Sequence, residues 1–331
     1  MNAERFARLF VIGLLIGLPL ALFSARLLPL DRSARAIEMH ARMPESGGWL
    51  PTDVSARVGE PLRLRLTSDD VIHSFAIGQS DTPAVDIFPG QVVETTLVFD
   101  QPGKYVFYCT RWCGPNHWRM RGTIEVSGVS ATPEEEKIPL YAQLGIDIDA
   151  PHMAEVLPTR RPSAARGAQL GVQISDDYLS LAFLRSHSPA QVWQDLRADQ
   201  ISQGFNDEQV WDLVAMLWQR ATTPEALAEG RQLYAQNCAA CHGEDGTGDG
   251  VMADSLTTDG QSHPETEHAT KPPAQFSEVA NMLGASPALL QGKIVRGGMG
   301  TGMPYWGPVF TEEQTWALVG YLWSFQFDFE E

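Results

Sequence analysis

The stretch from residue 48 to residue 128 is dominated by short runs in which hydrophobic and polar positions alternate. Such alternation is typical of strands that bury one face, and turn residues such as Pro89-Gly90 separate the runs. The runs are residues 62–68, 92–99, 104–108 and 122–127. We therefore predict a small antiparallel β-sandwich or barrel over residues 48–128.

After residue 137 the hydrophobic pattern becomes helical. Thr223-Pro224-Glu225 is typical of a helix start with proline in the first turn, and Thr311 to Gln314 forms a capping box ahead of an aromatic helix. These signals predict an all-α unit over residues 222–331. The polar, acidic stretch between the two patterns, residues 129–137, is interpreted as a solvated linker.

The region between the linker and the all-α unit contains an internal repeat. SPAQVWQDLR, from Ser188, parallels SPALLQGKIVR, from Ser286, and FNDEQVWDLVAMLW, from Phe205, parallels FTEEQTWALVGYLW, from Phe310. The first copy contains no cysteine. We predict that residues 138–221 are a duplicated, haemless relative of the C-terminal unit that acts as a spacer. The alternative is that two amphipathic helix ends converged on one pattern.

The N-terminus carries a long apolar run. Leu9 to Ala25 holds no charged residue, and Leu27 to Leu30 extends the run to about the 20 residues that a membrane-spanning helix needs. We predict a single-pass membrane anchor over residues 1–30, followed by a juxtamembrane segment, residues 31–47. The alternative is a secretory signal peptide, since basic residues precede the run and Ala34-Arg35-Ala36 has the pattern of a cleavage site. Under either interpretation, the rest of the chain is expected to lie outside the cytoplasm.

Composition and charge restrict the classes of function that the chain can have. With 331 residues the chain is long enough for about two folded domains, and its net charge of −17 argues against nucleic-acid binding. The four cysteines fall into two close pairs, Cys109/Cys113 and Cys238/Cys241, so each pair is expected to have a local task. The predicted fold class is multidomain: one N-terminal transmembrane helix, an all-β domain and then an all-α region.

The second cysteine pair belongs to the motif C-x-x-C-H, residues 238–242. This spacing supplies two thiols for thioether bonds to haem and a neighbouring imidazole for its iron. A thioredoxin-like dithiol is the alternative, but it requires a βαβ context that the helical pattern does not offer. For the second axial ligand, GGMGTGMPYW offers Met299 and Met303. We favour Met303, since the proline and aromatic residues that follow it would stiffen the loop.

The first cysteine pair lies in YCTRWCGPNHWRM, residues 108–120, with the spacing C-x3-C-x3-H-x2-M. A zinc site would use both cysteines, His117 and the distant His73, but it has no need of Met120. A mononuclear blue-copper site leaves one cysteine unexplained. Two thiolates can instead bridge two copper ions, each capped by one histidine. Two coppers are favoured, with zinc and one copper as the alternatives.

Residues 222–331 resemble class I cytochrome c through LYAQNCAACHGEDGTGDG, GMPYW and the final aromatic helix. The resemblance implies one covalent haem c, joined through thioethers to Cys238 and Cys241. It also implies six-coordinate iron with His242 and Met303 as axial ligands. A unit of this kind carries electrons and offers no open coordination position.

Residues 48–128 resemble the copper A domain of subunit II of the haem-copper oxidases. The resemblance rests on DVIHSFAI, PGQVVETTLVF, QPGKYVFYC and the C-x3-C-G-x2-H-x2-M run. It implies a cupredoxin fold, a Greek-key sandwich or barrel, that holds binuclear copper A. The implied ligands are His73, Cys109, the backbone carbonyl of Arg111, Cys113, His117 and Met120.

Together, these resemblances identify the chain as an electron-transfer subunit II of a membrane-bound haem-copper terminal oxidase. No residue of this chain is expected to reduce oxygen. The implied partners are a membrane-embedded catalytic subunit I and an external electron donor, such as a cytochrome or a quinol-oxidising complex. The implied location is the bacterial cytoplasmic membrane, with the redox domains on the periplasmic side.

Two departures from the family pattern leave the terminal reaction open. Many members carry a glutamate that helps to hold magnesium where this chain has Arg111, so we predict no magnesium ion from this subunit. Many members also have two N-terminal hydrophobic segments, whereas this chain has one. Because one-segment forms also occur among copper A-containing nitric oxide reductases, such a reductase is the first alternative. A membrane-tethered electron shuttle is the second.

Overall fold

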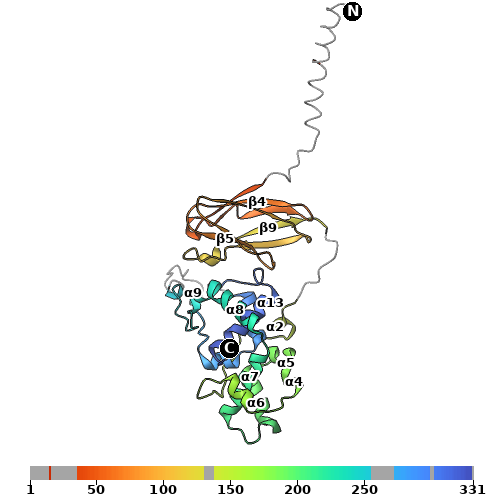
Figure 1. Ribbon diagram of the computed structural model, residues 1–331, viewed down its shortest axis with the longest axis vertical. Helices are drawn as coiled ribbons and strands as arrows, with labels where there is room; N and C mark the ends of the chain where they lie inside the picture. Colours follow the sequence, from red (N-terminus) through yellow and green to blue (C-terminus); the bar gives the residue numbers. More distant parts are fainter. Residues whose placement is uncertain (1–14, 16–35, 130–137, 255–271, 299–301, 330–331) are drawn as a thin grey trace, which may run out of the picture.

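The computed structural model describes residue 15 and residues 36–129, 138–254, 272–298 and 302–329. A β-sandwich is followed by a helical region, and the two lie one above the other in Figure 1. Within these described ranges, no helix is long and apolar enough to cross a membrane. The anchor predicted over residues 1–30 lies outside the described residues, apart from Leu15.

Two sheets form the β domain. One has four strands in the order β2-β1-β4-β7, and the other has five in the order β3-β9-β8-β5-β6. The strands are β1 (Ile37–Ala41), β2 (Trp49–Leu50), β3 (Asp53–Arg57), β4 (Leu62–Ser68), β5 (His73–Ile77), β6 (Val85–Ile87), β7 (Val92–Leu97), β8 (Gly103–Tyr108) and β9 (Arg121–Ser127). Two short 3-10 helices, η2 (Pro44–Ser46) and η3 (His117–Arg119), lie in its loops.

The β domain begins before the predicted residue 48, and it is not wholly antiparallel. β1 lies inside the predicted juxtamembrane segment, residues 31–47, and pairs in parallel with β4. β3 likewise pairs in parallel with β9. β1 was missed because it is only five residues long and only Met39 and Ala41 are fully buried, which is too short an alternation to stand out.

An aromatic cluster fills the centre of the sandwich. β4 turns its leucines inward and its arginines outward, so one face of its sheet is apolar. Against that face Trp49, Phe75 and Phe107 pack with ring centroids 5.4–5.6 Å apart. Burying one such side chain stabilises the fold by about 1.5–3 kcal/mol. Cys109 lies just after Phe107 in the chain, so this core supports the loop that carries the cysteines.

The helical region shares one hydrophobic core, with buried residues from Ile148 to Phe327. Its helices are α2 (Leu140–Gln143), α3 (Ala164–Gln169), α4 (Asp176–Leu179), α5 (Leu181–Ser186), α6 (Pro189–Ala198), η4 (Gln200–Ser202), α7 (Asp207–Arg220), α8 (Pro224–Asn237), α9 (Ala239–His242), α11 (Val279–Gly284), α12 (Pro287–Arg296), α13 (Glu312–Leu322) and η5 (Trp323–Phe325). The predicted caps are present: Thr223 accepts a hydrogen bond at the start of α8, and Thr311 forms the capping box of α13.

The two copies of the sequence repeat contain the same crossed pair of helices. α8 crosses α13 at Gly230, where an added Cβ would lie 2.1 Å from the Ala317 carbonyl oxygen. α3 crosses α7 at Gly167, where an added Cβ would lie 2.1 Å from the Asp212 carbonyl oxygen. Asp212 and Ala317 occupy matching positions in the repeated sequence. The repeat therefore extends to the packing of the helices, and a gene-level duplication stays a prediction.

Residues 138–221 do not lie between the β domain and the C-terminal unit. α6 and α7 lie at the end of the molecule away from the sandwich, whereas α8, α9 and α13 lie nearer to it (Figure 1). The Gln79 backbone N–H also donates directly to the Val309 carbonyl oxygen at 2.9 Å. The predicted spacer is therefore not interposed between the two candidate redox sites.

Candidate metal centres

The first candidate site is built from one loop and one strand of the β domain. The loop leaves β8 at Cys109 and reaches β9 after Met120. It turns at Gly114, with φ 126°, and at Asn116, with φ 55°, and glycine and asparagine adopt positive φ with the least strain. His73 begins β5, which lies beside β8 in the same sheet. Sheet pairing thus brings His73 to the base of the loop.

Cys113 is at the centre of one half of this site. Its Sγ lies 3.3 Å from His117 Nδ1 and 3.6 Å from Met120 Sδ. The 3-10 helix η3 places these two side chains on the same side as the cysteine. An imidazole, a thiol and a thioether therefore converge from within one loop.

Cys109 is at the centre of the other half. Its Sγ lies 3.9 Å from His73 Nδ1 and 3.3 Å from the Arg111 carbonyl oxygen. The ligand atoms of His73, Cys109 and Cys113 all lie within 4.8 Å of one another. The structure thus brings all the predicted copper ligands together. The exposed fractions are His73 0%, Cys109 3%, Cys113 4%, His117 3% and Met120 1%.

The pKa values of the two thiols of this site are shifted in opposite directions. Hydrogen bonding to Cys113 lowers the pKa of the Cys109 thiol in spite of its burial, and the histidines assist. Hydrogen bonding to Cys109 and burial in turn raise the pKa of Cys113. Two thiolates, two imidazoles and a thioether form a soft donor set that suits copper. The residues therefore fit a pair of copper ions, whose charge would stabilise the second thiolate.

Asp70 orients His73, and sequence reasoning missed it. Its carboxylate lies 2.7 Å from His73 Nε2 and accepts the N–H groups of Val71 at 2.6 Å and Met43 at 2.7 Å. Burial alone would raise the pKa of Asp70, but these hydrogen bonds outweigh it and the pKa is lowered. Because Asp70 holds Nε2, the other ring nitrogen of His73 is directed at the sulfur. Nothing in the local sequence distinguishes Asp70 from the neighbouring Asp69.

The side chain of Arg111 turns away from the ligands. Its guanidinium forms a two-pronged ion pair with Asp86 on β6, with Nε to Oδ1 at 2.9 Å and Nη2 to Oδ2 at 2.5 Å. A guanidinium has no lone pair for a cation. The absence of a magnesium ligand at this position therefore stays a prediction that the side-chain chemistry supports.

The second candidate site lies where α8 meets α9. Cys238 ends α8, and Cys241 and His242 lie on α9. His242 Nδ1 lies 2.9 Å from the Ala274 carbonyl oxygen, and the Phe276 ring stacks on the imidazole at 4.7 Å. This contact fixes the imidazole and leaves Nε2 as the nitrogen that can bind a metal.

The thiols of this second pair are not activated. Burial raises the pKa of Cys238 to about 12, and it also raises the pKa of Cys241. A thioredoxin-like dithiol has a lowered thiol pKa, so these raised pKa values argue against that alternative. Met303 is half-buried and packs against the helical core. Two thiols and an oriented imidazole fit a covalent haem c. Met303 as the second axial ligand stays a prediction, and the alternative ligand Met299 lies outside the described residues.

Two family models match the chain. Residues 227–326 match the family of cytochrome c, and residues 50–127 match the periplasmic domain of cytochrome c oxidase subunit II. The first range contains the C-x-x-C-H motif, and the second contains His73 and the cysteine loop. These matches confirm the resemblance drawn from the motifs, and both families are electron-transfer families.

Two curated relatives match about a quarter of the chain. Two proteins named cytochrome c oxidase subunit 2, one from Thermus thermophilus and one from a particular strain of that species, are 34% identical to the chain over 79 residues. The alignment covers 24% of this chain and 58% and 46% of those relatives, so it spans about half of their length.

Two solved structures are similar to part of the chain. A haem-copper terminal oxidase dimer solved by cryo-EM contains a chain with 26% identity and a TM-score of 0.25, covering 38% of this chain and 100% of its own. The periplasmic domain of subunit II of the cytochrome oxidase of Bradyrhizobium japonicum has 28% identity and a TM-score of 0.22, covering 27% and 62%. The assignment of the two domains rests on the family models.

Proposed function

Because the chain joins a cytochrome c oxidase subunit II periplasmic domain to a cytochrome c domain, we propose that it is the electron-entry subunit of a haem-copper terminal oxidase. Electrons enter at the C-terminal unit, cross to the β domain and leave for a membrane-embedded catalytic subunit. A covalent haem c and binuclear copper A, when bound, would each accept and release one electron. Under this proposal both domains lie on the periplasmic side of the membrane.

The observation that carries the proposal is the contrast between the two thiol pairs. Cys109 lies beside the imidazole of His73 and Cys113 beside that of His117, a donor set that suits metal ions. Cys238 and Cys241 belong to the C-x-x-C-H motif, whose imidazole is oriented by the Ala274 carbonyl oxygen, an arrangement that suits a covalent haem. One chain thus offers two different redox sites.

The residues around the copper ligands favour fast electron transfer by keeping the site rigid. The ligands are almost fully buried, the aromatic core lies beneath their loop, and Asp70 fixes His73. A site whose ligands are held in place reorganises little when its charge changes. The covalent link between the two domains also replaces a diffusional encounter with one at high effective concentration.

The full chain, purified with its membrane complex, tests this proposal. In the chain separated from that complex we expect two copper atoms per haem iron, and an electron paramagnetic resonance spectrum in which the unpaired electron couples to two copper nuclei. The complex should consume oxygen when a cytochrome or quinol system supplies electrons. Coupling to a single copper nucleus would overturn the copper A assignment.

The same preparation separates the alternatives. Turnover with nitric oxide and none with oxygen would reassign the chain to a nitric oxide reductase. Purification in mild detergent without any membrane partner would instead identify a tethered electron shuttle. A large membrane-embedded subunit that co-purifies with the chain is the result that the proposal requires.

A further inference from the structure

Residues 305–309, here called the interdomain segment, link the cytochrome unit to the β domain. The segment begins two residues after Met303 and packs against the β domain. On its cytochrome side, the N–H groups of Trp306 and Gly307 donate to the carbonyl oxygens of Ile294 and Val295, each at 3.1 Å. These bonds fix the segment to the end of α12.

The carbonyl groups of the same segment face the β domain. Arg121 Nη1 donates to the Tyr305 carbonyl oxygen at 2.9 Å. The Gln79 side chain donates to the Gly307 carbonyl, and the Gln79 backbone N–H donates to the Val309 carbonyl at 2.9 Å. The interdomain segment is therefore bonded on one side to the cytochrome unit and on the other to the β domain.

The approach between the two domains is close at Gly78. A Cβ added there would lie 2.2 Å from the Pro308 carbonyl oxygen, a distance that a side chain cannot accept. Val106, Tyr108 and Trp118 of the β domain also pack against the helical core. These contacts show a fitted interface rather than two domains that touch at one point.

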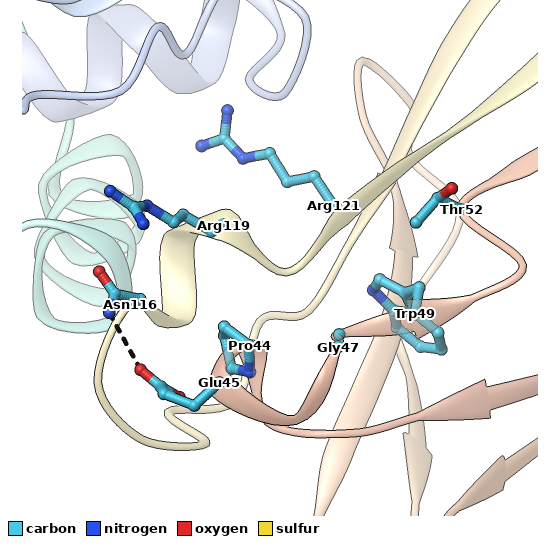
Figure 2. A pocket seen from close by; sticks show the side chains of 9 residues that line it. Pro44, Glu45, Gly47, Trp49, Thr52, Asn116, Arg119 and Arg121 are labelled. Carbon is cyan, nitrogen blue, oxygen red and sulfur yellow. Dashed lines mark hydrogen bonds between the residues drawn. The ribbon is translucent and has the colours of Figure 1, made fainter.

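Arg121 has an unusual place in this interface. It follows Met120 directly, and in the β8–β9 pair it lies opposite Tyr108, which precedes Cys109. Figure 2 shows Arg119 and Arg121 extending from η3 and β9 toward the helical region, along the edge of a cavity of about 260 Å³. Arg121 thus starts beside the copper ligands and ends at the other domain.

The charge of Arg121 is stabilised by the interdomain segment. Its Cζ lies 4.5 Å from the ring centroid of Trp306, within range of a cation–π contact. Its Nη2 is buried and has no hydrogen-bond partner in the described part of the chain. Burial lowers its pKa to about 10, so the group is still charged at neutral pH. An incompletely paired buried charge is costly, and the groups that offset the cost belong to the cytochrome unit.

We propose that Arg121 is a positioning residue for electron transfer: it holds the interdomain segment, and with it Met303, against the strand that follows the copper ligand Met120. Its positive charge beside that ligand also favours the reduced copper site. The inference rests on the proposed function, because it assigns a role within the transfer between the two sites. It adds a residue that binds neither metal.

Hydrogen exchange tests the positioning role without any redox reaction. The Gln79 amide bonds across the interface to Val309, whereas the neighbouring Gly78 amide bonds within the β domain to Val106. In Arg121→Met, Gln79 should exchange about tenfold faster, as expected for a contact worth about 1.4 kcal/mol, while Gly78 is unchanged. Arg119→Met is the control, since Arg119 is exposed and lines the same cavity.

Flash photoreduction of the haem in the full, metal-loaded chain tests whether Arg121 affects electron transfer from haem to copper. Arg121→Met should retain both cofactor spectra, transfer electrons to copper more slowly than wild type and lower the copper midpoint potential. Arg121→Lys should keep the potential near that of wild type and still transfer slowly, because an ammonium keeps the charge but not the planar fork.

A failure of the positioning role can be distinguished from a failure of the proposed function. Wild-type exchange at Gln79 and wild-type transfer in Arg121→Met would overturn the positioning role while leaving the proposed function intact. Equal effects of Arg119→Met would overturn it too. A wild-type chain that binds both cofactors but transfers no electron between them would instead refute the proposed function, and the exchange result would stand on its own.

Discussion

Replacing Asp70 with asparagine should weaken copper binding while leaving the β domain folded. The carboxylate accepts from Met43 with one oxygen, and it contacts both Val71 and His73 with the other. An asparagine has only one acceptor oxygen. Its NH₂ group must therefore face either the Met43 N–H or the Val71 N–H and the histidine ring. In either arrangement the charge that orients His73 is lost.

The expected size of the effect follows from the role of such partners. Loss of the carboxylate behind a metal-binding histidine costs about 10- to 100-fold in metal affinity, or about 1.4–2.7 kcal/mol. Competition between the chain and a copper chelator measures the affinity, and far-ultraviolet circular dichroism checks the fold.

Asp69→Asn provides a matched control. Asp69 is adjacent in the chain but contacts His40 at 2.9 Å and Arg42 at 2.7 Å on the surface, away from the copper ligands. Its substitution should leave copper affinity unchanged. The reasoning is refuted if Asp70→Asn binds copper as tightly as wild type, or if both variants lose affinity equally.

Three further predictions concern other parts of the molecule. Cys113→Ser should leave at most one copper per chain by metal analysis, since one bridging thiolate is lost; two bound coppers would contradict this. Gly230→Ala should destabilise the helical region by about 1–3 kcal/mol in denaturant unfolding, whereas Gly320→Ala, which meets only a side chain, should not. Pairing with Arg111 lowers the pKa of Asp86 below 3.8, so its stabilisation is present above about pH 4 and is lost as pH falls through the lowered pKa. The stability difference between wild type and Asp86→Asn should therefore shrink on acidification, and a pH-independent difference would contradict the assignment.

Sequence patterns located strands with a clear alternating run, such as β4, and missed the fully buried β5 and the short β1. β4, at Leu62–Ser68, coincides with the predicted run, because its leucines and polar residues alternate. β5, at His73–Ile77, is buried at every position and therefore shows no alternation. β1 depends on a parallel partner, β4, whose position no local pattern reveals. These two strands therefore depend on burial and pairing within the folded domain, which local sequence patterns do not show.

The candidate ligands of the cysteine loop and of the C-x-x-C-H motif could be proposed from spacing, whereas the residues that position them could not. The cysteine loop and the C-x-x-C-H motif lie close in sequence, so short-range spacing displays them. Arg121 and Tyr305 are 184 residues apart, and Gln79 and Gly307 are 228 apart. Such contacts exist only once both domains have folded and docked, so a single sequence carries no local signal for them.

Photoreduction of the haem in the isolated full-length chain, followed at the absorption of the copper site, tests the proposed electron path most directly. If one chain holds both cofactors and its two domains are docked through the interdomain segment, copper becomes reduced in a single step whose rate is independent of protein concentration. A rate that rises in proportion to protein concentration would show transfer between molecules. That result, or copper that stays oxidised while the haem is reduced, would contradict the proposed path.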